Sequence, residues 1–380
     1  MTDFDLILVG GGLQSSLMAL AVLDRRPGLR LALVERDERL GGNHTWCFHG
    51  PDVAAEDAAW LEPLVVRRWP SCEVAFPGRR RMLGLPYVAV TSDRLDEVVG
   101  RRVRESTGSV VMTGTAAVGV GAERVELAGG HVLRAPAVID ARGPLPAATD
   151  GCGFQKFLGL ELRLSRPRGD LRPLVMDATV PQRDGFRFLY LLPFAPDRVL
   201  LEDTYFSNGP ELDRPALRAG ILAEAEARGL AVERVVREEE GVLPMPWRQA
   251  ATAAGEAFTG GYRGGWFHPA TGYSFPAAVR LARRLAEILP RAPQASDWDS
   301  LRDEHERQAA FGRLLNRLLF TWVEPGERWR VFERFYGLPE ETIARFYAMR
   351  TSWVDRGRIL LGSRPPGLLP GRLLERWRAG

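Results

Sequence analysis

The stretch FDLILVGGGLQSSLMALAVLDRRPGLRLALVERDERLGGNHTW, residues 4–46, decides which fold the chain is expected to adopt. Its apolar run at 4–9 predicts a buried strand, and the glycines that follow predict a tight turn into a helix over 13–25. A second apolar run at 29–34 predicts another strand, which ends at Glu35. The stretch therefore predicts a β-α-β unit with a glycine turn between its first strand and its helix.

The glycines stand where a dinucleotide would need them. Gly10 permits the tight turn, and Gly12, together with Gly11 beside it, allows a pyrophosphate to approach the backbone at the helix N-terminus. Ser15 replaces the usual third glycine and is still small enough for close packing of helix on strand. Glu35, at the end of the second strand, is placed to accept hydrogen bonds from a ribose. The unit therefore predicts a Rossmann-type dinucleotide-binding domain.

The residues after Glu35 indicate which dinucleotide is bound. The motif GGNHTW, residues 41–46, resembles the loop that wraps the flavin end of the ligand in FAD-linked reductases and hydroxylases. With the N-terminal position of the unit, this loop favours FAD over a nicotinamide cofactor. The residues expected to bind the cofactor here are Arg36, Asn43, His44, Thr45 and Trp46.

Two later segments fit the same interpretation. VLRAPAVIDARGP, residues 132–144, predicts a strand that ends in a turn typical of such flavoproteins, and residues 257–289 predict a glycine-rich loop that opens a helix over 275–289. The loop resembles the second flavin-contacting segment, although Gly260-Gly261 replaces its usual Gly-Asp step. The residues expected to contribute to cofactor binding here are Asp140, Gly143, Gly261, Gly272 and Tyr273.

Two acids stand inside a strand that is otherwise apolar. FRFLYLLPF (186–194) and RVLLEDTYF (198–206) predict a hairpin, in which Glu202 and Asp203 point to opposite faces because side chains alternate along a strand. Only one of them can then face a given cavity. A buried carboxylate is costly unless it is paired or protonated, so the structural alternative is an ion pair of either acid with Arg187 across the hairpin.

Several motifs resemble one known family. GGNHTW, MDATV, FRFLYLLPF followed by LLEDTYF, GVLPMPW, FHPATGYSFP and FYGLPEETIARFYAMR occur in the order seen in the bacterial lycopene β-cyclases, over nearly the whole chain. The chain departs from the family pattern at Cys47, where serine is common, and at Ser15-Ser16. Neither departure touches the acid of LLEDT, and both leave open which end group is made and how many ends of the substrate are closed.

The resemblance implies a redox-neutral cyclisation of the ψ-ends of lycopene to β-rings, giving γ-carotene or β-carotene. It implies FAD in its reduced form, NAD(P)H as the electron donor, and Glu202 as the catalytic acid that protonates an alkene. Asp203 is expected to support Glu202. His268 is expected to contact the flavin or relay a proton, with a loop-bracing hydrogen bond as the alternative.

Two other functions stay open at this point. One is an FAD-dependent monooxygenase or desaturase acting on a carotenoid or terpenoid, for which a buried acid in the substrate lobe has no obvious use. The other is a non-catalytic flavin- or carotenoid-binding protein, for which Glu202→Gln would change only stability. Six aromatic residues are candidates for the cavity lining, with ordinary core packing as the alternative: Trp46, Phe188, Tyr190, Trp266, Phe267 and Tyr273.

The fold expected is α/β, a Rossmann-type FAD-binding domain with an inserted β-rich substrate domain and a helical C-terminal lobe. The FAD-binding domain is assigned to residues 1–50, 86–150 and 251–300, the substrate domain to 51–85 and 151–250, and the lobe to 301–380. In the lobe, FGRLLNRLLFTW predicts a helix with one apolar face. That face is expected to comprise Phe311, Leu314, Leu315, Leu318, Leu319 and Trp322.

The composition indicates where in the cell the protein is expected to work and which kinds of ligand it is not expected to bind. Residues 311–380 contain 13 arginines against 7 acidic residues, and this basic, aromatic tail suits the surface of a membrane, where lycopene would reside.

Lys156 is the only lysine among 51 basic residues, which favours genomic codon bias over nucleic-acid binding. Three cysteines without a CxxC pair, and His44 and His49 without a third ligand, predict neither disulfides nor a metal site. We expect a cytoplasmic protein peripherally bound to a membrane, with no signal peptide and of unspecified oligomeric state.

Overall fold

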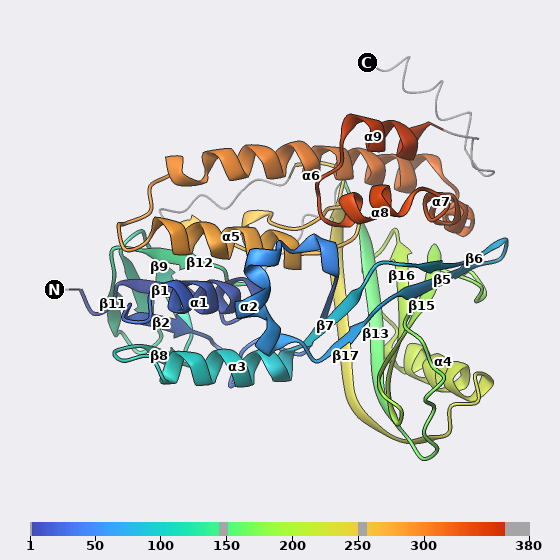
Figure 1. Cartoon of the computed structure of the whole chain (residues 1–380), viewed down its shortest axis with the longest axis horizontal. Helices are drawn as coiled ribbons and strands as arrows, with labels where there is room; N and C mark the ends of the chain where they lie inside the picture. Colours follow the sequence, from blue (N-terminus) through green and yellow to red (C-terminus); the bar gives the residue numbers. More distant parts are fainter. Residues whose placement is uncertain (1, 144–150, 250–256, 362–380) are drawn as a thin grey trace.

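The computed structural model describes residues 2–143, 151–249 and 257–361, and its elements form two main sheets with helices around them (Figure 1). The first sheet is parallel and has the order β18-β12-β1-β2-β8. Its strands are β1 (Leu6–Val9), β2 (Leu31–Val34), β8 (Val110–Met112), β12 (Val138–Asp140) and β18 (Phe258–Thr259). This sheet is the Rossmann-type part of the predicted α/β fold.

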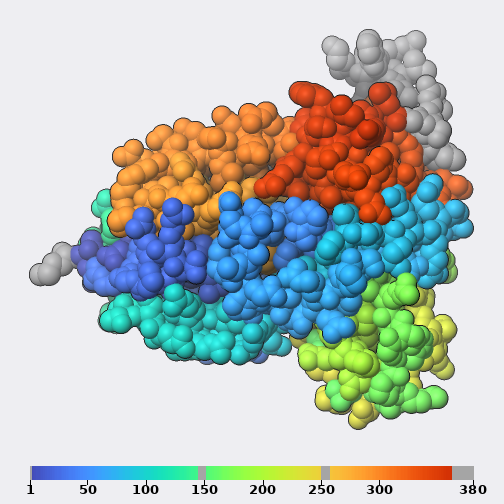
Figure 2. All heavy atoms as spheres, viewed as in Figure 1, coloured from blue at the N-terminus to red at the C-terminus, as the bar shows by residue number. Residues whose placement is uncertain are grey.

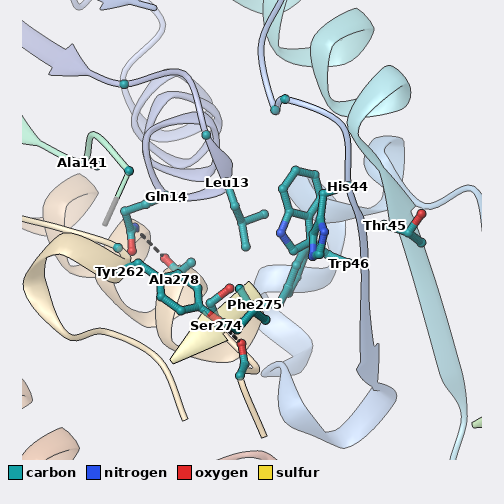
Figure 3. Close-up of a pocket in the computed structure, with 18 of the residues that line it drawn as sticks. Leu13, Gln14, His44, Thr45, Trp46, Ala141, Tyr262, Ser274, Phe275 and Ala278 are labelled. Atoms are coloured by element: carbon teal, nitrogen blue, oxygen red, sulfur yellow. Dashed lines mark hydrogen bonds between the residues drawn. The ribbon is translucent and has the colours of Figure 1, made fainter. Parts of the chain in front are cut away.

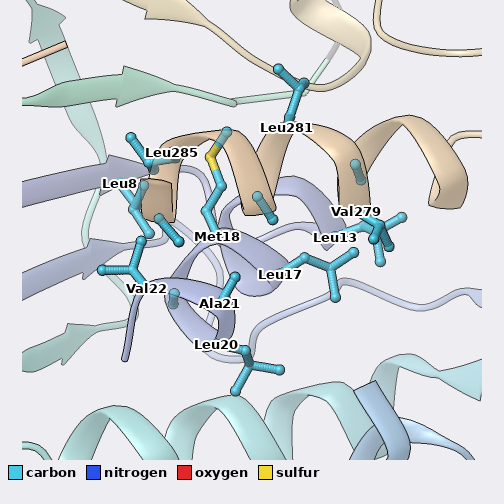
Figure 4. Close-up of a cluster of buried hydrophobic side chains, with 14 of the residues drawn as sticks. Leu8, Leu13, Leu17, Met18, Leu20, Ala21, Val22, Val279, Leu281 and Leu285 are labelled. Carbon is cyan, nitrogen blue, oxygen red and sulfur yellow. The ribbon is translucent and has the colours of Figure 1, made fainter. Parts of the chain in front are cut away.

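The β-α-β unit predicted from residues 4–46 is confirmed. Helix α1 (Leu13–Arg25) begins directly after Gly12, and the strands on either side are each shorter than predicted by two residues at their start. Leu17 and Met18 of α1 pack against α5 (Phe275–Ile288), whose Leu281 and Leu285 belong to the same buried cluster (Figure 4). This apolar contact fixes both helices on the parallel sheet.

The second sheet is long, mostly antiparallel and has the order β17-β13-β16-β15-β14-β5-β6. The predicted hairpin is confirmed as β15 and β16, which pair from Phe186↔Phe206 to Ala195↔Arg198. Helix α4 (Arg214–Ala227) lies against β13 and β16 on one face (Figure 1). The strands are β5 (Cys72–Phe76), β6 (Arg79–Leu83), β13 (Cys152–Leu164), β14 (Leu174–Asp177), β15 (Phe186–Ala195), β16 (Arg198–Ser207) and β17 (Val232–Pro246).

Two three-stranded sheets complete the strand pairing. One contains β3 (Thr45–His49), β7 (Tyr87–Thr91) and β4 (Arg67–Trp69), and the other contains β9 (Ala117–Val120), β10 (Arg124–Leu127) and β11 (Val132–Arg134). Within the segment 51–85, β5 and β6 join the second main sheet whereas β4 pairs with β7. The domain boundaries themselves stay a prediction.

Further helices pack around the sheets (Figure 1). They include the short α2 (Ala58–Leu61), α3 (Ser92–Arg104), and the C-terminal α6 (Ser296–Trp322), α7 (Trp329–Phe335), α8 (Glu340–Tyr347) and α9 (Trp353–Leu360). The C-terminal helices lie beside the β5–β6 hairpin (Figure 2), where the Arg81 guanidinium donates to the carbonyl oxygens of Tyr336 and Leu338. No helix in the described ranges is long and apolar enough to cross a bilayer.

The apolar face predicted for α6 is wrong in part. Leu314 is exposed, whereas Asn316, which the prediction placed off the apolar face, is 1% exposed. The Asn316 amide donates to the carbonyl oxygens of Pro246 and Pro269, so this polar side chain satisfies two buried acceptors. The inner face of the helix therefore passes through Gly312, Asn316, Leu319 and Phe320.

Candidate functional site

A cavity of about 790 Å³ lies between the carboxyl ends of β1 and β2 and the second main sheet. Ligands of open α/β sheets bind at this edge. Twelve of the predicted site residues line it: Gly10, Gly12, Glu35, Arg36, His44, Thr45, Trp46, Gly143, Glu202, Gly261, Gly272 and Tyr273. Five do not line it: Gly11, Asn43, Asp140, Asp203 and His268.

The glycine turn at the start of α1 has the shape that a dinucleotide requires. Gly10 has a φ of +93°, and a Cβ atom there would lie 2.7 Å from the carbonyl oxygen of Ala141. At Gly12 a Cβ atom would meet no atom within 4 Å, so this backbone is open to the cavity. The amide of Gly11 is used differently, because it donates to Oε2 of Glu35 at 2.5 Å.

Residues around the start of α5 close the same part of the cavity. Nε2 of Gln14 donates to the carbonyl oxygen of Ala278 at 3.2 Å (Figure 3), while its Oε1 is buried without a partner. Gly261 and Gly272 adopt positive φ angles of +57° and +70°, which glycine tolerates best. An open glycine turn, an acid at the end of β2 and an unpartnered buried amide oxygen together fit a bound dinucleotide.

Two residues that were predicted to bind the cofactor, Asp140 and Asn43, do not line the cavity and are hydrogen-bonded to other residues of the protein. The Asp140 carboxylate is bidentate with Arg142, whose Nη2 lies 2.8 Å from Oδ2. Asn43 links its loop to β17, because its Nδ2 donates to the carbonyl oxygen of Glu238 and its Oδ1 accepts from Nη1 of Arg237. Both residues brace segments that line the cavity, and their direct contact with a cofactor stays a prediction.

Aromatic side chains line the deeper part of the cavity. His44 and Trp46 lie side by side on one wall, with ring centroids 5.2 Å apart, and Thr45 points away from them (Figure 3). The hydroxyls of Tyr87 and Tyr273 are hydrogen-bonded at 2.9 Å. Of the six aromatic candidates, Trp46, Tyr190, Trp266 and Tyr273 line the cavity, whereas Phe188 and Phe267 do not. Phe188 stacks on Phe186, and Phe267 stacks on Tyr262, which itself lines the cavity.

Glu202 on β16 points into this aromatic part of the cavity. The Thr204 hydroxyl donates to its Oε1 at 2.7 Å, and Tyr190 is its register partner on β15. Burial raises the pKa of Glu202 to about 8, and the negative charge of Glu239 adds to the rise. The protonated acid therefore predominates at neutral pH, in a cavity whose walls are largely apolar.

Asp203 points to the opposite face, as the alternation of side chains predicts. It is fully buried, and Nε and Nη2 of Arg187 donate to its two oxygens at 2.8 and 2.9 Å. The hydroxyl of Tyr205 also donates to Asp203 at 3.0 Å. The ion pair across the hairpin, which the sequence allowed for either acid, thus forms between Arg187 and Asp203 and does not include Glu202.

His268 lies outside the cavity wall and braces its own loop. Its Nδ1 accepts from the amide of Ala270 at 3.1 Å, and its ring packs edge-on against Phe346 with centroids 4.6 Å apart. Burial lowers the pKa of His268 to about 3, which keeps the ring neutral. These contacts favour the loop-bracing alternative over a catalytic role.

The sequence interpretation missed Glu239, which is 2% exposed and faces the same cavity as Glu202. Three consecutive glutamates at 238–240 are typical of a strand exposed to solvent. For this reason the burial of the middle one, Glu239, was not predicted. Alternation along β17 offered a signal, since Glu239 must point away from its two exposed neighbours. Within the described ranges, no group of three or more His, Cys, Asp and Glu side chains is placed to hold a metal ion.

Comparisons with known proteins agree with the sequence motifs. The family model described as lycopene cyclase protein matches residues 5–370. The chain is 42% identical to the lycopene beta-cyclase of Pantoea ananas, over 96% of each chain, and 43% identical to that of Pseudescherichia vulneris, over 99% of this chain and 96% of the relative. A probable FAD-dependent monooxygenase from Pseudomonas aeruginosa shares the fold, with a TM-score of 0.60 and 18% identity over 88% of this chain and 98% of that one. The chain therefore belongs to the lycopene cyclase family.

Proposed function

We propose that this protein is a lycopene β-cyclase, an enzyme that closes the ψ-ends of lycopene to β-rings without net oxidation or reduction. The observation that carries the proposal is Glu202, a buried acid with a raised pKa at the apolar, aromatic end of the cavity. An acid kept protonated at neutral pH, close to where a hydrocarbon would bind, suits the protonation of an alkene.

The chain's own residues account for each proton in this reaction. Thr204 donates to Oε1 of Glu202, which leaves Oε2 to carry the proton that is transferred to the terminal double bond. The tertiary cation that results is attacked by the next double bond of the same chain, which closes a six-membered ring. Transfer of a ring proton back to the Glu202 carboxylate then forms the new double bond. Trp46, Tyr190 and Tyr273 present aromatic faces that stabilise a cation and exclude water.

We propose that FAD binds at the open backbone of Gly12, with its ribose near Glu35 and its flavin end near His44 and Trp46. The open glycine turn and the unpartnered Oε1 of Gln14 support this placement. In its reduced form, with NAD(P)H as the proposed electron donor, a bound flavin would supply an electron-rich ring system near the cavity in which the cation forms.

We also propose that the protein works at a membrane surface, because its substrate does not dissolve in water. Three apolar side chains on and after α9 support this: Trp353 is 84% exposed, Val354 61% and Leu361 78%. Arg356 lies over the Trp353 ring at 5.2 Å, so cationic and aromatic groups are combined on this surface. Such a combination suits the interface of an anionic bilayer.

An anaerobic assay tests the function. Purified protein is incubated with FAD, a chemical reductant and lycopene in liposomes. The pigments are then separated by chromatography, and their masses are measured by mass spectrometry. A product of unchanged mass that absorbs at shorter wavelength, and that is absent when the flavin stays oxidised, is the expected result. A product of altered mass would instead indicate a monooxygenase or desaturase. Unreacted lycopene in every flavin state would indicate a binding protein.

A further inference from the structure

Glu202 and Glu239 lie on either side of one residue in the second main sheet. On the central strand β13, Gly159 pairs with Glu202 of β16 and also with Glu239 of β17. Residues in register across neighbouring strands share a face of the sheet. Two buried carboxyl groups therefore point to the same face, separated only by the position of Gly159.

Gly159 leaves the space through which these carboxyl groups approach each other. A Cβ atom there would lie 3.0 Å from Cγ of Glu239 and 3.4 Å from Oε2 of Glu202. The backbone of Gly159 lies within a regular strand and does not have a positive φ, so its conformation does not call for glycine. What distinguishes this position is the missing side chain, because a larger one would stand between the two acids.

Glu239 is fixed in place by partners on its other side. Its Oε2 accepts from Nη1 of Arg237 at 2.6 Å and from the Thr45 hydroxyl at 2.8 Å. Arg237 is itself held by Glu161, with Nε 3.1 Å from that carboxylate. The guanidinium balances the charge of the Glu239 carboxylate, and both of these hydrogen bonds reach its Oε2.

We propose that Glu239 is a positioning residue for the acid: as a carboxylate held across Gly159, it keeps the proton on Glu202 and keeps that carboxyl group directed into the cavity. This inference rests on the proposed cyclase function for its purpose. After Glu202 gives its proton to the alkene, two carboxylates face each other beside the cation. The ring proton released after closure returns to Glu202, so the cycle consumes no proton, oxidant or reductant.

The other groups that face this pair do not supply a competing charge. The His44 ring comes from the loop before β3 and the Cys47 thiol from β3 itself. The Tyr87 and Tyr190 hydroxyls come from β7 and β15, and the Tyr273 hydroxyl comes from the loop before α5. Burial raises the pKa of the thiol and of the three tyrosines and lowers the pKa of His44, so all five groups are neutral at neutral pH. Asp203 points to the far face, where Arg187 pairs with it.

Infrared titration of the Glu202 carboxyl tests the inference without any need for turnover. The carbonyl band of the protonated acid is identified by its loss in Glu202→Gln, and its intensity is followed from pH 5 to pH 9 in the FAD-loaded protein. In the wild type the band should fall to half its intensity around pH 8. In Glu239→Gln, which removes the charge with little change of shape, the midpoint should fall by about one pH unit or more.

Two further variants separate this role from a merely structural one. Glu240→Gln removes a neighbouring exposed carboxylate of the same strand, which pairs with Arg214, and should leave the midpoint unchanged. Gly159→Ala retains both acids and should lower the midpoint in the same direction as Glu239→Gln, because the added methyl group pushes the carboxyl groups apart. An unchanged midpoint in both Glu239→Gln and Gly159→Ala would overturn the inference.

Activity then shows whether the pair serves cyclisation. For a one-unit fall in the midpoint, Glu239→Gln should lose about fivefold in rate at pH 8 and almost nothing at pH 6, because only the protonated fraction reacts. A loss of equal size at both pH values, with an unmoved infrared midpoint, would assign Glu239 a bracing role only. If the wild type itself forms no cyclic product, the proposed function fails, while the infrared midpoints still decide the inference about the pair.

Discussion

At the scale of single residues, the carboxyl group of Glu202 and that of Asp203 have opposite consequences when changed. Glu202→Gln removes the transferable proton and keeps the size of the side chain. We expect the rate of ring formation to fall by at least about a hundredfold, the usual contribution of a general acid. The free energy of unfolding should not fall, since a neutral amide replaces an acid whose ionisation burial already disfavours.

The measurement is single-turnover product formation in liposomes, with FAD content and urea unfolding recorded on the same samples. A Glu202→Gln protein that binds FAD, unfolds like the wild type and still cyclises lycopene at the normal rate would contradict the assignment of the acid.

Asp203→Asn should damage stability instead. Arg187 would lose its bidentate partner while only 3% exposed, and removal of one partner of a buried ion pair typically costs about 3–5 kcal/mol. Glu224, with a carboxylate oxygen 3.8 Å from Arg187, offsets part of this loss, so we expect a value near the lower limit. Urea unfolding measures the change, and a variant as stable as the wild type would show that the pair contributes little.

One physical rule was enough to predict from the sequence that these two acids point in different directions. Alternation along a strand places Glu202 and Asp203 on different faces, and the structure confirms this. The rule does not say which face meets the cavity. That answer depends on Arg187 and Tyr205, which occupy one face of the hairpin and satisfy Asp203. Glu239 could not be identified as a neighbour of Glu202 from the sequence. No local sequence pattern indicates the register in which β13 pairs with β16 and β17.

At the scale of elements, the glycine turn before α1 predicts two different responses to alanine. Gly10→Ala places a Cβ atom 2.7 Å from the carbonyl oxygen of Ala141 at a φ of +93°, and should cost about 1–3 kcal/mol of stability. Gly12→Ala meets no atom of the protein within 4 Å, and should fold normally. Its methyl group would instead occupy the space proposed for the pyrophosphate, so FAD affinity should fall.

Flavin fluorescence titration and thermal unfolding without FAD distinguish the two variants. Equal stability losses in both variants would contradict the difference in space at the two glycines. Normal FAD affinity in Gly12→Ala would place the cofactor elsewhere in the cavity.

The elements themselves were predictable to different degrees. Helix α1 begins and ends at the predicted residues, and α5 ends one residue before its predicted end, because glycine turns and a continuous apolar face mark them. Helix α6 was predicted to bury Leu314, which is exposed, and not Asn316, which is buried. Local hydrophobicity could not reveal that two proline carbonyls, from segments distant in the sequence, would need the Asn316 amide.

At the scale of the whole molecule, the exposed apolar residues of the C-terminal lobe predict a docking face for lipid. Replacing Trp353, Val354 and Leu361 by serine should weaken binding to anionic vesicles severalfold, because each residue removed takes apolar area out of the interface. The rate with detergent-solubilised lycopene should stay close to that of the wild type, since the cavity is untouched.

Vesicle co-sedimentation measures this, with Val118→Ser as the matched control. Val118 is 63% exposed on β9, in the sheet formed by β9, β10 and β11, which is separate from the C-terminal helices. Equal binding by the triple variant and the control would show that another face meets the membrane.

The position of Glu202 at the aromatic end of the cavity also sets the order in which products should appear. Lycopene has two identical ends, and we expect the Glu202 side chain to protonate one of them at a time. Closing the second ring requires the half-finished molecule to withdraw, turn end for end and enter again. An enzyme that held the molecule between the two ring closures would release little of the singly cyclised product. We expect instead that the singly cyclised molecule leaves the cavity before its second end enters. The singly cyclised pigment should therefore accumulate early and compete with fresh substrate for the same entrance.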